Sequence, residues 1–416
     1  MADHGYAAKY RPTDRLHLWL LTQPRQPVPI GDLSLIRSTQ GVSLRYGEQW
    51  LQRGFALSED LPLIDEEFLP EEKGVAVGAV DDARPDRWGE RVIRHIDKPS
   101  RLSLLEYLYF AGDDRFGALG VSTSADEYLP RRLGPLPTLE DADQIHELIR
   151  KVQDNEPVAA EHRRLISPGV TMGGARPKAL IDIAGEQWVI KFADGDPTDV
   201  PLIEHAAMTL ARKAAIRVAP TMPVRLTHGH AVAVKRFDRN RGVRVHCLSA
   251  CVALRAAAER FGYPELAQLL RRRGVIQGEA YVDHMHELFR RMVFNILIDN
   301  TDDHEKNHAL RVTDSQQYEL SPAYDVLPSG QALGFQQMRV GEQEADSTLA
   351  NALSMSLMFS LQTDAAVRQV RAVARIVGGW KEHFKSCGVS PGDIDLHAGQ
   401  IDRPFLRDQR NEIAAG

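Results

Sequence analysis

The stretch from Leu165 to Gly195, LISPGVTMGGARPKALIDIAGEQWVIKFADG, constrains the fold of this chain more than any other. Its first part, Ser167–Lys178, is rich in glycine and other turn-forming residues, and two short strand-like runs follow it, Ala179–Ile183 and Gln187–Phe192. Runs of this length that are separated by a tight turn are typical of a β-hairpin. The sequence therefore predicts, in order, a glycine loop, a strand, a turn and a second strand that carries Lys191.

The rest of the chain mixes strand and helix patterns, which predicts an α+β fold. Further strands are expected where short apolar runs lie between turn signals: Leu16–Leu21, Val42–Tyr46, Met222–Leu226, Ala231–Val234, Ala309–Val312 and Tyr318–Leu320. Helices are expected at Asp86–His95, Ser103–Ala111, Leu139–Asp154, Leu202–Ala214, Leu248–Phe261, Tyr263–Arg272, Tyr281–Asp299, Asp364–Val377 and Trp380–Ser386.

A length of 416 residues exceeds what one hydrophobic core usually serves, so several subdomains are expected. Proline and glycine crowd Leu129–Pro137, which indicates a boundary there, and the pattern becomes mainly helical after Arg239. The sequence predicts three parts, residues 1–135, 136–239 and 240–416.

The composition, 43% hydrophobic and 26% charged, is typical of a soluble globular protein. The net charge of -6 argues against a surface built mainly to hold nucleic acid or anionic lipid, and no apolar run approaches membrane-spanning length. The 3 cysteines form no CxxC pair. We therefore expect a cytoplasmic protein with reduced cysteines.

A second informative stretch, ILIDNTDDHEKNHALRV, runs from Ile296 to Val312 and has two interpretations. In the first, His304, Glu305 and His308 form the HExxH signature of a zinc hydrolase, which needs a helix to bring both imidazoles to one face. The run of Asp and Asn before it usually ends helices, and a strand is expected soon after. The extended motif would also place glycine and histidine where the chain has Arg311 and Asp314, so the zinc interpretation is disfavoured.

The second interpretation is the catalytic loop of a kinase, in which a base and a magnesium-binding Asn lie five residues apart, as Asp302 and Asn307 do. Upstream, the Gly173-Gly174 pair lets backbone amides approach phosphates, and Lys191 can neutralise their charge. Glu204, expected in the first turn of its helix, is a candidate to orient that lysine. Downstream, Asp325 is the candidate second metal ligand, because magnesium prefers oxygen donors.

These motifs resemble the HipA-like serine/threonine kinases, which are toxins of bacterial toxin-antitoxin modules. The resemblance is carried by MGGARPKAL (172–180), VIKFA (189–193), KRFDR (235–239), NTDDHEKNHAL (300–310) and SPAYDVLP (321–328), with RPDRWGERVIRH (84–95) similar to the family's N-terminal subdomain. It implies a two-lobed, protein-kinase-like fold with a β-rich N-lobe, an extra N-terminal subdomain and a mainly helical C-lobe.

The resemblance also implies roles for individual residues. Asp302 is implied as the catalytic base, and Lys235 to Phe237 as the hinge beside adenine. The residues implied at the ATP site are Gly173, Gly174, Ala175, Arg176, Pro177, Lys178, Lys191, Lys235, Arg236, Phe237, His304, Glu305, Lys306, Asn307, Tyr324 and Asp325. Kinases of this kind autophosphorylate a serine in the glycine loop, for which this chain offers Thr171 and, four residues earlier, Ser167.

The function implied is that of an ATP- and Mg²⁺-dependent kinase that phosphorylates an aminoacyl-tRNA synthetase, halts translation and promotes growth arrest or persistence. The implied partner is a HipB-like helix-turn-helix antitoxin, which would provide most of the DNA contact. The alternative is a catalytically inactive, nucleotide-binding corepressor with a kinase fold. The presence of Lys191, Asp302, Asn307 and Asp325 together argues against that alternative.

Overall fold

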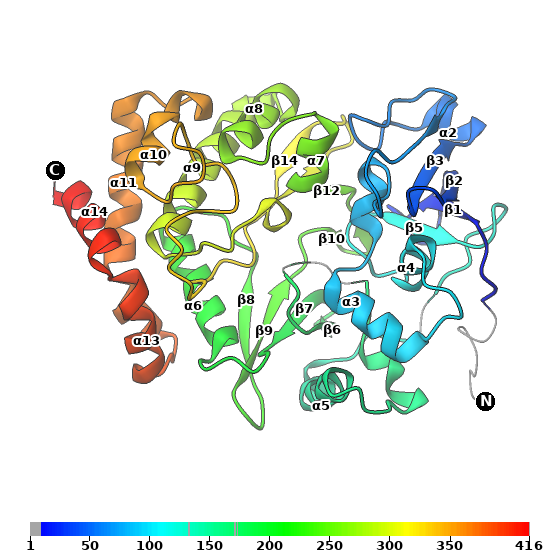
Figure 1. Cartoon of the computed structure of the whole chain (residues 1–416), viewed down its shortest axis with the longest axis horizontal. Helices are drawn as coiled ribbons and strands as arrows, with labels where there is room; N and C mark the ends of the chain where they lie inside the picture. The colour runs from blue at the N-terminus through cyan, green and yellow to red at the C-terminus, as the bar shows by residue number, and fades with distance from the viewer. Residues whose placement is uncertain (1–9, 132–133, 170–171, 173, 416) are drawn as a thin grey trace. The chain divides into compact units, whose positions relative to one another are not determined.

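A computed structural model describes residues 10–131, 134–169, 172 and 174–415 of the chain (Figure 1). The chain forms two compact units. The first contains the residues up to Lys191 together with Asp238–Leu248, and the second contains Phe192–Phe237 together with the chain from Ser249 onward. The division into three parts at residues 135 and 239 remains a prediction.

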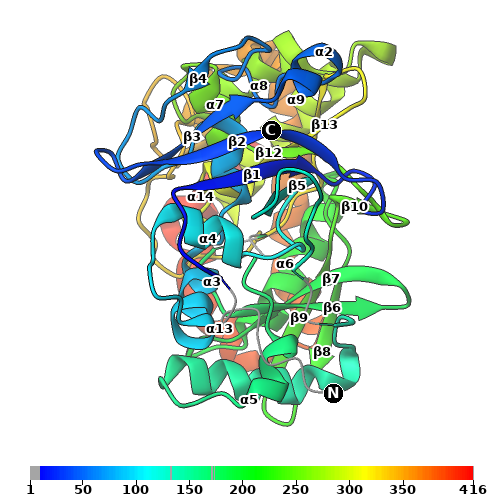
Figure 2. The same ribbon diagram turned by 90° about the vertical axis from the view of Figure 1, so that its right-hand side faces the viewer.

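The first unit contains a five-stranded antiparallel sheet in the order β4-β3-β2-β1-β5 (Figure 2). Its strands are β1 (Arg15–Leu20), β2 (Val28–Ile36), β3 (Gly41–Tyr46), β4 (Glu67–Phe68) and β5 (Leu119–Ser122). Strands β2 and β3 approach closely at Gly31, where an added Cβ would lie 2.1 Å from the carbonyl oxygen of Arg45. Helix α4 (Leu104–Phe110) packs on the sheet. The predicted strands at 16–21 and 42–46 are confirmed.

The other helices of this unit lie in the segments that join its strands. They are α2 (Glu48–Arg53), α3 (Arg87–Val92), which continues as a π-helical turn (Ile93–Asp97), α4 (Leu104–Phe110) and α5 (Ala142–Gln153). Helix α4 begins with a capping box formed by Ser103 and Glu106, and α5 buries Ile145, Leu148 and Ile149 along one face. The helices predicted at 86–95, 103–111 and 139–154 are confirmed as α3, α4 and α5, with ends that differ by a few residues.

The predicted hairpin after the glycine loop is present as β6 (Lys178–Ile183) and β7 (Glu186–Phe192), which pair antiparallel. Ala184 and Gly185 form its turn, with φ angles of 54° and 81°. Two positive φ angles are the signature of the tight turn that matches the twist of a hairpin. The short strands β10 (Arg239–Asn240) and β11 (Val243–Arg244) also pair in this unit.

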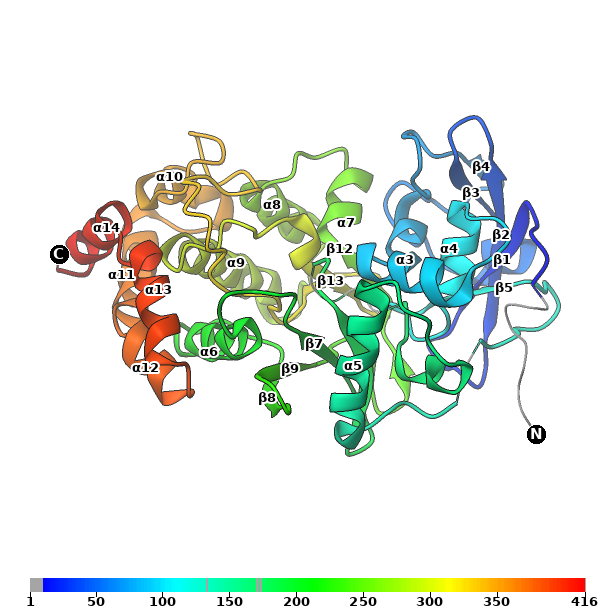
Figure 3. The ribbon, with the colours of Figure 1, turned by 60° about the horizontal axis from the view of Figure 1, so that its bottom comes forward.

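The second unit begins with helix α6 (Val200–Lys213) and the hairpin of β8 (Thr221–Arg225) and β9 (His230–Lys235). Its centre is α9 (Ala280–Leu297), which packs against α8 (Tyr263–Arg273) and α11 (Thr363–Gly378) (Figure 3). Strands β13 (Ala309–Val312) and β14 (Tyr318–Leu320) form a further hairpin. The remaining helices are α7 (Ala250–Ala256), α10 (Leu349–Ser354), α12 (Trp380–Ser386), α13 (Pro391–Ile401) and α14 (Pro404–Ala415).

One predicted helix, Leu248–Phe261, is wrong at both ends. Residues Cys247–Ser249 form strand β12, and the helix α7 begins after Ser249, whose hydroxyl accepts a hydrogen bond from the amide of Val252 at 3.2 Å. The helix ends at Ala256, and Ala258 has a φ of 53°, which a helix cannot contain. Within the described ranges, no helix combines the length and apolar character needed to cross a membrane.

Candidate functional site

Within the stretch that has two interpretations, Ile296–Val312, residues Asn300–Asn307 form a loop. We call it the catalytic loop after its predicted role. Helix α9 ends at Leu297, Asp299 turns the chain with a φ of 59°, and only Glu305–Asn307 forms a single 3-10 turn before β13. The α-helix that the zinc interpretation requires is therefore not formed in this stretch.

The two histidines of the HExxH pattern have different partners. His304 Nδ1 accepts a hydrogen bond from the amide of Lys306 at 3.2 Å, whereas His308 Nε2 lies 2.8 Å from Asp303 Oδ2. Over the part of the chain that the structure describes, no group of three or more His, Cys, Asp or Glu side chains is arranged to hold a metal. The kinase interpretation of this loop is the one that the geometry fits.

A buried polar network lies beneath the catalytic loop, with Asp303 at its centre. The Tyr263 hydroxyl donates to Asp303, the Asn295 amide donates to that hydroxyl at 3.3 Å, and the Asn300 amide donates to Asn295 Oδ1 at 3.1 Å. Burial alone would raise the pKa of Asp303, but His308 and the Tyr263 hydroxyl hold it below its usual range. The network fixes both ends of the loop to helices α8 and α9.

Sequence reasoning missed this network. Asp303 is adjacent to the predicted base, and its sequence context suggested only a residue that ends a helix. Its partner Tyr263 lies 40 positions away in the chain, so no local pattern links the two.

The two residues predicted to act in the catalytic loop differ in their exposure to solvent. Asp302 is exposed, whereas Asn307 is only 4% exposed. The Asn307 amide nitrogen reaches the Asp302 carbonyl oxygen at 3.5 Å. The Asn307 Oδ1 atom is buried and has no hydrogen-bond partner among the described residues. A buried oxygen without a donor is costly unless a ligand completes it, and a magnesium ion would do so.

The segment of the predicted second metal ligand is tied to the same loop. The buried Tyr324 donates its hydroxyl to the carbonyl oxygen of Lys306 at 2.8 Å. The next residue, Asp325, has a left-handed φ of 59°, a conformation that Asp adopts more readily than most residue types. The metal role of Asp325 remains a prediction.

The predicted hinge, Lys235 to Phe237, lies at the end of β9 in the same unit. Arg236 is buried, and Lys235 and Phe237 are half-buried. The Phe237 ring stacks on Tyr324, with ring centroids 5.5 Å apart and an interplanar angle of 26°. The second unit therefore brings together the hinge, the catalytic loop and the segment of Asp325.

The predicted glycine loop belongs to the first unit, and two of its predicted residues, Thr171 and Gly173, lie outside the described residues. Gly174 and Ala175 are exposed, whereas Pro177 is buried. Arg176 is half-buried. The exposed backbone at Gly174 and Ala175 is where a phosphate could approach main-chain amides.

Lys178 ends the glycine loop and is fully buried. Its ammonium contacts Asp86 Oδ2 and the Gly174 carbonyl oxygen, each at 2.5 Å. Asp86 also caps helix α3, because its Oδ1 accepts from the amide of Gly89 at 2.9 Å, and the Trp88 indole donates to the Lys178 carbonyl at 2.9 Å. Helix α3 thus anchors the end of the glycine loop. The sequence did not predict this contact, although the motif that carries Asp86, RPDRWGERVIRH (84–95), was recognised.

Lys191 lies directly opposite Lys178 in the β6–β7 hairpin and is 1% exposed. Cross-strand partners project from the same face of a hairpin, so two ammonium groups share one side. One of the two, that of Lys178, already pairs with Asp86, and the phosphate role of Lys191 remains a prediction. Glu204 is the fifth residue of α6, in its second turn and not its first, because the helix begins at Val200. It is buried in the second unit, and its pairing with Lys191 remains a prediction.

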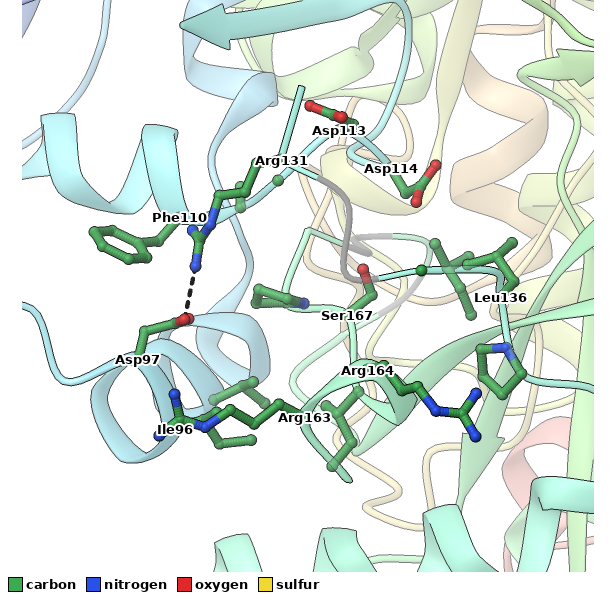
Figure 4. A pocket seen from close by; sticks show the side chains of 18 of the residues that line it. Ile96, Asp97, Phe110, Asp113, Asp114, Arg131, Leu136, Arg163, Arg164 and Ser167 are labelled. Atoms are coloured by element: carbon green, nitrogen blue, oxygen red, sulfur yellow. Dashed lines mark hydrogen bonds and ion pairs between the residues drawn. The ribbon is translucent and has the colours of Figure 1, made fainter. Parts of the chain in front are cut away.

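A pocket of about 50 Å³ in the first unit includes Ser167, the second autophosphorylation candidate (Figure 4). Arg163 and Arg164 line it together with Ser167, and Arg131 pairs with Asp97 at 2.6 Å on another wall. Burial raises the pKa of Asp97, which Arg131 acts to lower. The half-buried serine therefore has basic side chains within its own pocket.

Comparison with known proteins places this geometry in a family. Residues 170–380 match the HipA-like C-terminal domain, which is about half of the chain, and residues 26–122 match the HipA N-terminal domain. A putative kinase, Y4dM of Sinorhizobium fredii, is 29% identical over 244 residues, which cover 52% of this chain and 58% of that protein. The chain thus spans less than two thirds of that relative's length.

A longer match is to the serine/threonine-protein kinase toxin HipA of Shewanella oneidensis, with 23% identity over 342 residues and 72% of each protein covered. Among solved structures, the complex of Shewanella oneidensis HipA, HipB and operator DNA is similar, with a TM-score of 0.66, 18% identity, and coverage of 96% of this chain and 99% of that chain. That likeness confirms the predicted α+β, kinase-like fold. On the match to its C-terminal domain model, the chain belongs to the HipA-like family.

Proposed function

We propose that this chain is an ATP- and Mg²⁺-dependent serine/threonine kinase. The observation that carries the proposal is the buried, unpartnered Asn307 Oδ1 in a loop that also carries the exposed Asp302. The hydrogen bond from Tyr324 to Lys306 ties this loop to the segment of Asp325, which supports a shared metal site. A buried oxygen acceptor beside an exposed carboxylate is what phosphoryl transfer needs.

In this proposal each residue has one task. The Asp302 carboxylate takes the proton of the acceptor hydroxyl as the new P–O bond forms and ADP leaves. Lys191 neutralises phosphate charge, and Glu204 orients that lysine. Asn307 and Asp325 would hold magnesium, which supplies positive charge to the phosphates. Lys235 to Phe237 would contact adenine, with the Phe237 ring held in place by Tyr324.

The proposed setting is a toxin-antitoxin module with a HipB-like helix-turn-helix partner. Support comes from the similar Shewanella oneidensis protein, whose structure is a complex of HipA, HipB and operator DNA. The net charge of -6 fits a protein that leaves most DNA contact to its partner. By the family resemblance, the proposed substrate is an aminoacyl-tRNA synthetase, and its phosphorylation would arrest growth.

Self-inactivation by phosphorylation in the glycine loop is also proposed, on Thr171 or Ser167. Mass spectra of tryptic fragments from protein expressed with active kinase should locate phosphate at one of these two positions. Phosphate found solely elsewhere would contradict this regulation without touching the kinase proposal.

The decisive assay measures transfer of ³²P from labelled ATP to the protein itself and to lysate proteins. Wild type should label, Asp302→Asn should not, and Asp314→Asn, an exposed aspartate between β13 and β14, should behave as wild type. If neither wild type nor variant transfers phosphate although ATP binds, the inactive nucleotide-binding corepressor becomes the better explanation.

A further inference from the structure

The chain beyond residue 380, which the match to the HipA-like C-terminal domain does not include, returns to the catalytic loop. Arg403 lies in the short connection between α13 and α14, and its Nη1 forms an ion pair with Asp299 Oδ2 at 2.8 Å that lacks hydrogen-bond geometry. The Asp299 side chain is 0% exposed and that of Arg403 is 16% exposed. One residue of α13, Gln400, also donates from Nε2 to the carbonyl oxygen of Gly330 at 2.7 Å.

Asp299 occupies the joint between helix α9 and the catalytic loop. Its carbonyl oxygen accepts from the amide and the hydroxyl of Ser329, each at 3.0 Å. The Ser329 hydroxyl also lies 2.6 Å from that of Thr301, one residue before the proposed base. This joint therefore ties the segment that carries Asp302 to the segment that follows Asp325.

A carboxylate buried at such a joint needs a counter-charge, because an uncompensated buried charge is strongly unfavourable. Burial raises the pKa of Asp299, and Arg403 is the cation that acts to lower it. Without Arg403, the left-handed turn at Asp299 would hold a buried carboxylate with the Ala332 backbone beside it but no cation, and the joint would relax to hydrate it.

We propose that Arg403 is a positioning residue for phosphoryl transfer. From the C-terminal helical pair it holds Asp299, and through Asp299 it holds the segment on which Asp302 stands. Gln400 supports the same joint from the side of Gly330. The inference rests on the proposed kinase function for its catalytic consequence. The contact of Arg403 with Asp299, which we call the brace, does not depend on activity.

The test compares Arg403→Gln with Arg403→Lys, which keeps the charge, and with Arg407→Gln, which removes an exposed arginine of the same helical pair. The first measurement is amide hydrogen exchange of the peptide spanning 296–312 in the full chain. Arg403→Gln should exchange at least about tenfold faster in this peptide, because the joint opens locally, while Arg407→Gln should match wild type. Unchanged exchange in Arg403→Gln would overturn the brace.

The second measurement separates kcat from KM for ATP. Displacement of a reacting group by about 1 Å can cost up to about 100-fold in rate, so Arg403→Gln should lose at least about tenfold in kcat with KM unchanged. Arg403→Lys should restore most of that loss. Faster exchange with an unchanged kcat would overturn the positioning role.

Two further outcomes keep the inference separable from the kinase proposal. If wild type transfers no phosphate, the proposed function fails, and the exchange measurement still decides on the brace. If Arg403→Gln does not fold, Gln400→Ala removes the contact to Gly330, together with a contact to His397 inside α13, and keeps the pair of Arg403 with Asp299. It should give the same changes in smaller measure, and wild-type exchange in that folded variant would count against the brace.

Discussion

The catalytic loop and the glycine loop are held in different ways. The catalytic loop stands on a network of several buried groups, in which Asp303 is shared between Tyr263 and His308. The end of the glycine loop is held at the Lys178 ammonium, which pairs with Asp86 and donates to the Gly174 carbonyl. A network with many members fixes a carboxylate in one geometry, whereas contacts at one ammonium act on the point where a loop ends.

The difference fits the tasks proposed for the two loops. A base and a metal ligand must stay within a fraction of an ångström of the productive geometry. A loop that covers phosphates needs only an anchored end and a backbone free to approach them. Substitutions in the catalytic loop, in its supporting network and at the end of the glycine loop test this contrast.

Asp302→Asn should lower kcat by about 10²- to 10⁴-fold, since that is the usual contribution of a general base. Because the Asp302 side chain is exposed and is not one of the buried groups around Asp303, the midpoint of thermal unfolding should not change. Steady-state kinetics measures the change in kcat, and calorimetry of the same preparation measures the unfolding midpoint. A variant that unfolds earlier than wild type would show that Asp302 belongs to the support and not to the chemistry.

Asp86→Asn should reduce the free energy of unfolding by about 3–5 kcal/mol, because it removes the carboxylate that pairs with the buried Lys178 ammonium. Asn is also a good N-cap, so the cap of α3 survives and the loss reports on the ion pair. Urea unfolding measures the change. Asp65→Asn, which breaks an exposed pair with Arg45 in the same unit, is the control and should leave the unfolding midpoint unchanged.

Tyr263→Phe should cost less, about 1–3 kcal/mol, because Asp303 loses one donor and keeps His308. The same variant should also lower kcat, since the loop it supports carries Asp302. Tyr281→Phe in α9 is a matched control, because the Tyr281 hydroxyl makes no hydrogen bond to the described residues. Equal losses in Tyr263→Phe and Asp86→Asn would remove the contrast between the network under the catalytic loop and the contacts of the Lys178 ammonium.

The smallest effect concerns pH. The pKa of Asp303 is lowered on folding, so the ionised carboxylate contributes stability above its unfolded pKa of about 3.9, and this contribution is lost as pH falls through the lower folded value. The difference in unfolding free energy between wild type and Asp303→Asn should be constant from pH 7 to about 5 and should narrow below about 4, by about 1.4 kcal/mol for each unit of lowering. Urea titrations at several pH values measure it. If the difference in unfolding free energy grows as the pH falls, the pKa of Asp303 is raised on folding and not lowered.

Many local elements of this protein and most candidates for its site could be predicted from the sequence, although strand β2 and helices α13 and α14 were not. Hairpin β6–β7, helices α9, α11 and α12 and the loop at 300–307 follow from periodicity, turn residues and helix-ending residues, which act between neighbours in the chain. Asp302, Asn307 and Asp325 are recognisable because their spacing reflects one loop and one hairpin.

The groups that support those candidates became visible in the folded chain and not in its sequence. Asp303 and Tyr263, Lys178 and Asp86, and Arg403 and Asp299 are each separated by 40 to 104 positions, so no local pattern joins them. What joins them is burial: a charge removed from water must meet a partner, and the fold chooses which distant side chain is there to meet it.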